Sequence, residues 1–217
     1  MKKDQTLGES LREQGVSRRS FLKFCAATAS MMALPPSMIP VIASTLEKAR
    51  RPSVIWLSFQ ECTGCTESIT RSSSATIEDL IFNAISLDYH HTLQAASGDA
   101  AEAAREAAME ENHGKYVLVV DGSIPTANPG YSTIAGISNV DMLKDTAAGA
   151  AAIVAVGSCA AFGGIPKANP NPTGAVSVSD LITDKPIINV PGCPPIPAVI
   201  TGVLVQFLTF GLPELDD

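Results

Sequence analysis

Residues 53–65 read SVIWLSFQECTGC, and the interpretation of the whole chain begins from this stretch. Its first seven residues are mainly β-branched, aromatic or aliphatic, which is typical of a buried strand. A turn follows at once and carries Cys62 and Cys65 with two residues between them. The stretch therefore predicts a buried strand with a pair of thiols just beyond its carboxyl end.

Similar short apolar runs recur along the chain and alternate with helical patterns. We expect further strands at 85–89, 116–120, 151–156 and 186–190, and helices at 99–111, 138–148 and 197–210. Asp99 and Glu102 have the spacing of a capping box at the start of the first helix. Strands of about five residues that are separated by helices favour parallel pairing with helices on both faces. The sequence thus predicts an α/β domain with a flavodoxin-like, doubly wound parallel sheet.

The composition indicates a globular domain. Of the 217 residues, 46% are hydrophobic and 17% are charged, which is enough apolar surface for a sizeable core. The net charge is −7 and aromatic residues make up only 5%, so a basic, aromatic-rich surface for nucleic acid is not expected. No apolar run reaches the length of an ordinary membrane-spanning helix.

The first 43 residues differ from the rest in charge. They contain six Lys and Arg against three Asp and Glu, whereas residues 44–217 contain nine against nineteen. The segment SRRSFLK at 17–23 matches a twin-arginine export signal, and an apolar run at 24–34 follows it. A basic surface turn before a buried helix is the alternative.

We therefore expect residues 1–45 to be a twin-arginine signal peptide that is cleaved near 43–45, with residues 46–217 as the mature domain. The protein would then be periplasmic, or bound to the outer face of the cytoplasmic membrane. This route exports folded proteins, commonly with a cofactor already inserted, so the signal favours a cofactor. Cys25 lies inside the signal and is not counted with the site.

The other four cysteines each follow a predicted strand. They are Cys62, Cys65, Cys159 and Cys193. The first two follow the strand at 53–59, and the others follow the strands at 151–156 and 186–190. Loops that leave the carboxyl ends of parallel strands share one edge of the sheet, where ligands bind. We therefore expect the four thiols to meet at one site.

Four thiolates suit either an iron–sulfur cluster or zinc, because both favour soft ligands. Structural zinc usually uses two paired-cysteine knuckles, whereas this chain has one CxxC pair and two isolated cysteines in Gly- and Pro-rich loops. The spacing favours an iron–sulfur cluster and leaves zinc, two disulfides or unlinked buried thiols open. A flavin is disfavoured, since the loop after the first strand carries cysteines where a phosphate-binding loop would lie.

Other polar residues give weaker signals. Glu61 and Thr63 flank Cys62, and for them a role facing a partner and a solvated role stay equally open. His90, His91 and His113 have no cysteine or carboxylate spaced with them as a ligand set, so we expect solvated or hydrogen-bonded histidines. Trp56 is expected in the core.

Several motifs together resemble the small subunit of nickel–iron hydrogenases. They are ECTGCTES at 61–68, LDYH at 87–90, GSCAAFGG at 157–164, NPTGA at 171–175 and PGCPP at 191–195. The resemblance covers almost the whole chain, including the twin-arginine leader. It implies a flavodoxin-like domain that holds a proximal [4Fe-4S] cluster through Cys62, Cys65, Cys159 and Cys193.

The resemblance also implies partners. The nickel–iron centre that oxidises hydrogen would lie in a separate large subunit, and this chain would accept its electrons as the second member of a heterodimer. A cytochrome or another acceptor would take the electrons onward. No nucleic acid is expected as a partner.

The chain departs from the family in two places. Oxygen-tolerant members carry extra cysteines where this chain has Gly64 and, near Cys159, Gly164, so ordinary oxygen sensitivity is expected. Family members also continue with a domain for a medial [3Fe-4S] and a distal [4Fe-4S] cluster, whereas no cysteine follows Cys193 here. The resemblance therefore implies a fragment or a truncated product with one cluster.

Two alternatives to this family remain. The iron–sulfur subunit of respiratory NADH dehydrogenases resembles the same domain, but it has adjacent cysteines where this chain has Cys62-Thr63-Gly64-Cys65. A non-catalytic exported module with structural zinc is the alternative from another class of protein. The identity of the bound metal separates the second alternative from the hydrogenase interpretation.

Overall fold

The structure, a computed structural model, describes residues 6, 8–9, 15–48, 51–73, 76–81 and 85–212. The chain forms two compact units. Unit 1 comprises Met1–Pro52, Ile69–Ser86 and Ile196–Asp217, and unit 2 comprises Ser53–Ser68 and Leu87–Pro195. The expectation of a truncated chain rests on its end at residues 213–217, which lie outside the described residues. All four candidate ligands belong to unit 2.

Unit 2 is built on a five-stranded sheet in the order β2-β1-β3-β7-β9. The strands are β1 (Ser53–Ser58), β2 (Ser86–His90), β3 (Val117–Asp121), β7 (Ala152–Val156) and β9 (Ile187–Val190). The pairings of β1 with β3, β3 with β7, and β7 with β9 are all parallel. Counted along the chain this is the flavodoxin order, so the predicted fold class is confirmed.

The register aligns the carboxyl ends of four strands. Ser58 pairs with Asp121, Asp121 with Val156, and Val156 with Val190. These four residues form one line across the sheet, and β1, β3, β7 and β9 all end on it. The segments that follow β1, β7 and β9 therefore start side by side.

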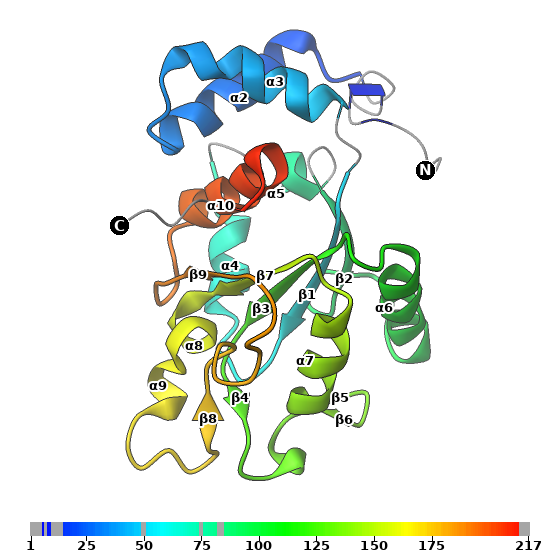
Figure 1. The fold of residues 1–217 in the computed structure, drawn as a ribbon, viewed down its shortest axis with the longest axis vertical. Helices are drawn as coiled ribbons and strands as arrows, with labels where there is room; N and C mark the ends of the chain where they lie inside the picture. Colours follow the sequence, from blue (N-terminus) through cyan, green and yellow to red (C-terminus); the bar gives the residue numbers. More distant parts are fainter. Residues whose placement is uncertain are drawn as a thin grey trace. The chain divides into compact units, whose positions relative to one another are not determined.

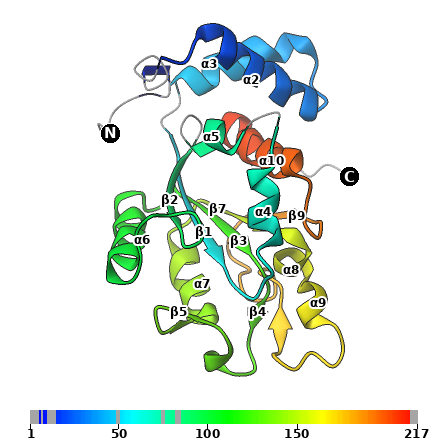
Figure 2. The same cartoon turned by 180° about the vertical axis from the view of Figure 1, so that it is seen from behind.

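Helices flank the sheet of unit 2. The helices are α6 (Asp99–Glu111), α7 (Asn139–Ala148), α8 (Gly157–Phe162) and α9 (Gly164–Lys167). Figure 1 and Figure 2 show α6 and α7 together on one side and α8 and α9 on the other. Side chains of α6 and α7 share a core with one face of β1, β3 and β7. Every residue of those three strands is buried, because both of their faces are covered.

The start of α6 differs from the prediction. Asp99 lies inside the first turn, and Gly98, with a φ of +58°, is the N-cap without any side-chain hydrogen bond. The predicted capping box is therefore wrong. Glu102 instead accepts hydrogen bonds from the Tyr89 hydroxyl at 2.7 Å and from Arg105 at 3.1 Å. A tertiary partner, Tyr89, and a neighbour in the same helix, Arg105, thus hold the carboxylate that the capping box would have used.

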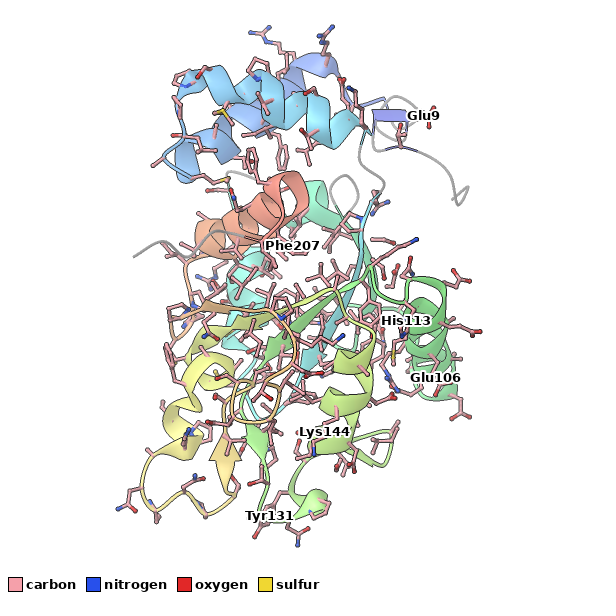
Figure 3. All side chains as sticks on the ribbon, viewed as in Figure 1. Glu9, Glu106, His113, Tyr131, Lys144 and Phe207 are labelled. Atoms are coloured by element: carbon pink, nitrogen blue, oxygen red, sulfur yellow. The ribbon has the colours of Figure 1, made fainter. Side chains whose placement is uncertain are left out.

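The two long loops at the carboxyl edge contain short elements. These are β4 (Ile124–Pro125), η3 (Pro129–Tyr131), β5 (Thr133–Ile134), β6 (Ile137–Ser138) and β8 (Ala175–Val176). Strand β4 pairs with β8, and β5 with β6, in each case antiparallel. Figure 3 shows Tyr131 on these loops, beyond the ends of the parallel strands.

Unit 1 is helical. Its helices are α2 (Arg18–Met31), η1 (Pro36–Met38), α3 (Ile39–Lys48), α5 (Ile77–Asp79) and α10 (Pro197–Phe210). The last of these confirms the helix expected at 197–210, and α4 (Gly64–Thr70) runs from unit 2 into unit 1. Cys25 is buried between α2 and α3. Across the described ranges, no helix has both the length and the apolar character to cross a bilayer.

His90 is buried in unit 2 beside Trp56, which is itself in the core as predicted. Their rings stack with centroids 5.1 Å apart. The His90 Nδ1 accepts a hydrogen bond from the backbone N–H of Thr92 at 3.3 Å, so the ring proton lies on Nε2, which meets Thr66 Oγ1 at 3.5 Å. Burial, followed by the charge of His91, lowers the pKa of His90 to about 4.

This environment predicts a stability that depends on pH. The unfolded chain binds a proton at His90 near pH 6.5, whereas the folded chain binds it only near pH 4. The free energy of unfolding is therefore not reduced by His90 above pH 6.5. It falls by about 3 kcal/mol in total as the pH drops from 6.5 to about 4. We expect His90→Gln to flatten the fall in unfolding free energy between these pH values.

Denaturant unfolding at a series of pH values measures this slope. His113→Gln is the control, because His113 lies exposed after α6 (Figure 3) and should keep the wild-type slope. Equal slopes for wild type and His90→Gln would contradict the prediction.

Candidate metal centre

The four candidate cysteines lie together at the carboxyl edge of the sheet. Cys62 lies between β1 and α4, Cys65 in the first turn of α4, Cys159 in α8 and Cys193 just after β9. All four line one small pocket. The convergence predicted from the strand ends is therefore confirmed, while the role of these residues as metal ligands stays a prediction.

The pocket surrounds a hollow. Within the part of the chain that the structure describes, no three His, Cys, Asp or Glu side chains meet at one point as the ligands of a single ion do. In a cubane cluster each thiolate binds a different iron, so its ligands surround the cluster. All five cysteines of the chain carry free thiols.

The surroundings of Cys159 differ from the expected loop. Gly157, with a φ of +86°, lets the chain turn from β7 directly into α8, so Cys159 lies in a short helix. The backbone N–H of Ser158 donates a hydrogen bond of 2.7 Å to the Gly192 carbonyl, which joins this turn to the segment of Cys193. The two isolated cysteines are thus held together by backbone contacts.

Glycines lie against three of the four sulfur atoms. A Cβ added to Gly157 would lie 2.5 Å from the sulfur of Cys65, and one added to Gly164 would lie 2.6 Å from the sulfur of Cys159. A Cβ added to Gly64 would lie 3.2 Å from the sulfur of Cys62. The first two distances are shorter than any that a real Cβ tolerates, so no side chain fits there unless the thiols move. The backbone can therefore approach the sulfurs closely, as it does around iron–sulfur clusters.

These residues fit an iron–sulfur cluster in two respects. Four thiols are the donor set that a [4Fe-4S] cluster requires. The glycine cradle brings backbone to the sulfurs, where N–H groups can donate hydrogen bonds to them. Four thiols also fit zinc in donor type, and iron and zinc analysis of the purified chain distinguishes the two.

Burial favours the protonated form of two of the four thiols, Cys65 and Cys159. Burial, then the charge of Asp121, raises the pKa of Cys65 well above its ordinary value. Burial, then the charge of Cys193, raises the pKa of Cys159. A metal that binds here has to displace these protons, because the thiolate is the ligand.

Asp121 is a site residue that the sequence analysis missed. It is the last residue of β3, is 1% exposed and lines the same pocket. Burial and the charge of Glu61 raise its pKa to about 7, while hydrogen bonds from Cys65 and Thr66 act in the opposite direction. Among the residues that the structure describes, none forms a hydrogen bond with its Oδ2. A charged residue at the end of a buried strand, at the edge that carries the cysteines, was the available signal.

Glu61 also lines the pocket. Thr63 donates a hydrogen bond of 3.3 Å to its Oε1. Its Oε2 is buried, and no described residue forms a hydrogen bond with it. Burial raises the pKa of this carboxyl group. Glu61 is therefore partly enclosed at the site, which favours a role at the pocket over a fully solvated one.

The comparisons with known proteins agree with this geometry. Residues 62–207 match the family described as NADH ubiquinone oxidoreductase, 20 Kd subunit. The uptake hydrogenase small subunit of Azotobacter vinelandii is 46% identical over 218 residues, which cover 100% of this chain and 61% of the relative. The hydrogenase-2 small chain of Escherichia coli (strain K12) is 45% identical, with 99% of this chain and 57% of the relative covered. The chain belongs to this family, in its hydrogenase small-subunit branch.

Solved structures of hydrogenases are also similar to this chain. The Ni-Fe-Se hydrogenase of Desulfomicrobium baculatum has a TM-score of 0.74 and 36% identity over 77% of this chain and 68% of that chain. The actinobacterial-type NiFe-hydrogenase of Ralstonia eutropha H16 has a TM-score of 0.67 and 27% identity, covering 76% and 56%. The chain spans about three fifths of the length of its curated relatives. Identities near 45% to hydrogenase small subunits favour this branch over the NADH dehydrogenase alternative.

The glycine cradle generates a prediction for Gly157→Ala. A left-handed backbone costs an alanine about 1 kcal/mol, and the contact with Cys65 adds about 1–3 kcal/mol of overpacking. We expect a lower unfolding free energy and loss of most of the bound metal, measured by denaturant unfolding and by metal analysis.

Gly136→Ala is the matched control for this variant. Gly136 has a similar φ of +79°, but an added Cβ there has nothing within 4 Å. This variant should pay only the backbone term and keep its metal. Equal metal content in the two variants would show that the cradle does not constrain the site.

Proposed function

We propose that this chain is the electron-transfer subunit of a nickel–iron hydrogenase. Cys62, Cys65, Cys159 and Cys193 would hold a proximal [4Fe-4S] cluster, which receives electrons from hydrogen oxidation in a large subunit. The observation that carries the proposal is the delivery of four thiols to one pocket by three strand ends. Membership of the hydrogenase small-subunit branch supports it.

The residues of this chain hold and shield the cofactor. The four thiolates bind the irons, and the glycines beside them allow backbone dipoles to approach the sulfurs. When bound, the cluster supplies one-electron redox chemistry that no side chain of the site offers. The buried strand ends cover one side of the pocket, where Asp121 is 1% exposed, whereas Cys62 and Cys193 are exposed.

Exposed apolar side chains beside Cys159 suggest where the large subunit docks. Phe162 at the end of α8 is 58% exposed, and Ile165 in α9 is 78% exposed. Large apolar side chains that face solvent together commonly mark an interaction surface. Because electrons have to pass from the partner's metal centre to the cluster, a contact next to a cluster ligand places the two subunits suitably. We assign Phe162 and Ile165 to this interface.

The remaining steps of the electron path lie outside this pocket. We propose a cytochrome or another electron carrier as the acceptor downstream. The medial [3Fe-4S] and distal [4Fe-4S] clusters of the family would need residues that this sequence does not contain. Gly64 and Gly164 stand where oxygen-tolerant members carry extra cysteines, so we propose ordinary oxygen sensitivity.

We also propose export by the twin-arginine route, with residues 1–45 as the signal and the periplasmic side of the membrane as the destination. Arg18 and Arg19 support this, because both are exposed at the start of α2. Ser17 caps that helix by accepting a hydrogen bond from the Ser20 N–H at 3.1 Å. The paired arginines are thus presented to solvent at a helix start.

Metal analysis of Cys159→Ser tests the cofactor. The wild-type chain, purified without air, should contain about four irons, as a cubane with four thiolates requires. Cys159→Ser should lose the iron, and hydrogen oxidation by its complex with the large subunit should be lost with it. Cys25→Ser is the control, because Cys25 is buried in unit 1 outside the site and should leave the iron content unchanged. Zinc in the wild-type chain would instead support the non-catalytic alternative.

A double substitution tests the docking surface. Phe162→Asp with Ile165→Asp places two charges on the proposed contact, and we expect the large subunit to dissociate while the iron stays bound. Size-exclusion chromatography and iron analysis measure these two effects. Glu106→Lys is the control, since Glu106 is exposed on α6 on the other side of unit 2 (Figure 3). Retention of the heterodimer by the double variant would remove these residues from the interface.

A further inference from the structure

The NPTGA segment at 171–175 belongs to the motifs of the sequence, yet none of its residues lines the cysteine pocket. Its backbone is held by its own first residue. The Asn171 Oδ1 accepts a hydrogen bond from the Ala175 N–H at 2.7 Å, and its Nδ2 donates one to the Ala175 carbonyl at 3.1 Å. Asn171 has a φ of +46°, a conformation that asparagine adopts more readily than most residues. The segment is therefore a closed, pre-formed turn.

The turn is also joined to the loop after β4. Thr126 Oγ1 donates a hydrogen bond of 2.7 Å to the Gly174 carbonyl, and the Ala127 N–H donates one of 3.0 Å to the Thr173 carbonyl. A Cβ on Gly174 would lie 2.9 Å from the Ala127 nitrogen, so only glycine allows this approach. These contacts hold the turn at the carboxyl edge of the sheet.

The turn presents Thr173 to Gln60, which lies two residues before Cys62. The hydroxyl of Thr173 lies 3.1 Å from the Gln60 Nε2, which donates to it, and 3.2 Å from the Gln60 Oε1, to which it donates. Ser123 Oγ donates a further hydrogen bond of 3.3 Å to the same Oε1. Three loops that are far apart in the sequence thus meet at one side chain.

The backbone at Gln60 is held as well. Gln60 and Ser123 exchange two backbone hydrogen bonds, each of 3.0 Å. A Cβ on Gly122 would lie 2.9 Å from both the Gln60 carbonyl oxygen and the Glu61 Cβ, so β3 ends directly against this loop. The backbone at the start of the Cys62 loop is therefore packed closely against the end of β3. The side chain of Gln60 is held by its hydrogen bonds with Thr173.

We propose that the Asn171–Ala175 turn is a clamp on the Cys62–Cys65 loop and that Gln60 is the positioning residue through which it acts. The proposal rests on the proposed function, because the loop that is clamped would hold two of the four cluster ligands. Gln60 and Thr173 do not touch the cluster. Cys62 is itself exposed and Cys65 is half-buried, so the clamp limits how often the loop opens around Cys65.

Opening of this loop has two measurable consequences. A chelator reaches the iron through the open state, so each lost hydrogen bond of the clamp speeds iron release by about fivefold. Water that reaches the cluster stabilises its reduced form, which carries one more negative charge, so the midpoint potential rises. A residue that only supports the fold elsewhere would change neither quantity.

The experiment compares full-length chains purified without air. Gln60→Leu and Thr173→Val remove the clamp with little change of shape, and Thr173→Ser keeps the hydroxyl. Thr133→Val is the matched control, since Thr133 is exposed on β5. We expect faster iron release and a raised midpoint potential, followed by electron paramagnetic resonance, in the first two variants only. The double variant should match Gln60→Leu alone, because that change already removes both hydrogen bonds with Thr173 as well as the one from Ser123.

Two results separate failure of the clamp from failure of the proposed function. If the wild-type chain contains the cluster but Thr173→Val equals Thr133→Val in iron release and potential, the clamp is overturned. If the wild-type chain contains no iron, the proposed function fails, and alkylation of the half-buried Cys65 thiol in the same chains decides the clamp. Faster alkylation of Cys65 in Thr173→Val, with Cys193 unchanged, supports the clamp, and equal rates overturn it. Should Gln60→Leu not fold, the comparison of Thr173→Val with Thr173→Ser carries the test.

Discussion

The site depends on the level carboxyl ends of the parallel strands. In the line Ser58–Asp121–Val156–Val190 each strand stops at the same height, so the segments that follow start about 5 Å from one another. A shift of register by one residue would separate these segments and turn their side chains to the other face. Four cysteines that lie up to 131 positions apart in the chain meet because this register is fixed by apolar residues buried on both faces of the sheet.

The sequence allowed the strands and the cysteines to be predicted, because both follow from local patterns. Five apolar runs identified the five strands, and the cysteines were recognised by their position after three of them. Asp121 was not recognised, since its importance comes from register: β3 lies between β1 and β7, so its last residue faces the pocket. The capping box failed for a similar reason. Glu102 has the right spacing, but Arg105, three residues on in the same helix, and Tyr89 of β2 compete for its carboxylate, and the Tyr89 contact is not visible in local sequence.

The Gln60–Thr173 contact lies beyond local reasoning as well. The two residues are 113 positions apart, and each looks like an ordinary polar loop residue. Only the motif at 171–175 indicated that its loop has a defined shape. The structure supplies the reason: the Asn171 side chain forms hydrogen bonds with the Ala175 backbone, and Thr126 forms one with Gly174. The architecture therefore divides two tasks. The sheet edge brings the cysteine segments together, and the clamp holds the one that carries two thiols.

Electrostatics connects this architecture to metal binding. Four thiolates with Asp121 and Glu61 would gather up to six negative charges in one small pocket, which is unfavourable unless cations compensate for them. Without metal the pocket avoids this by keeping protons, as the raised pKa values of Cys65, Cys159 and Asp121 indicate. Cluster insertion would exchange the thiol protons for iron and so bind the three strand ends together. Asp121 is tolerated beside the ligands for a related reason: its carboxyl group can hold a proton near neutral pH, so it adds little negative charge and keeps a hydrogen-bond donor.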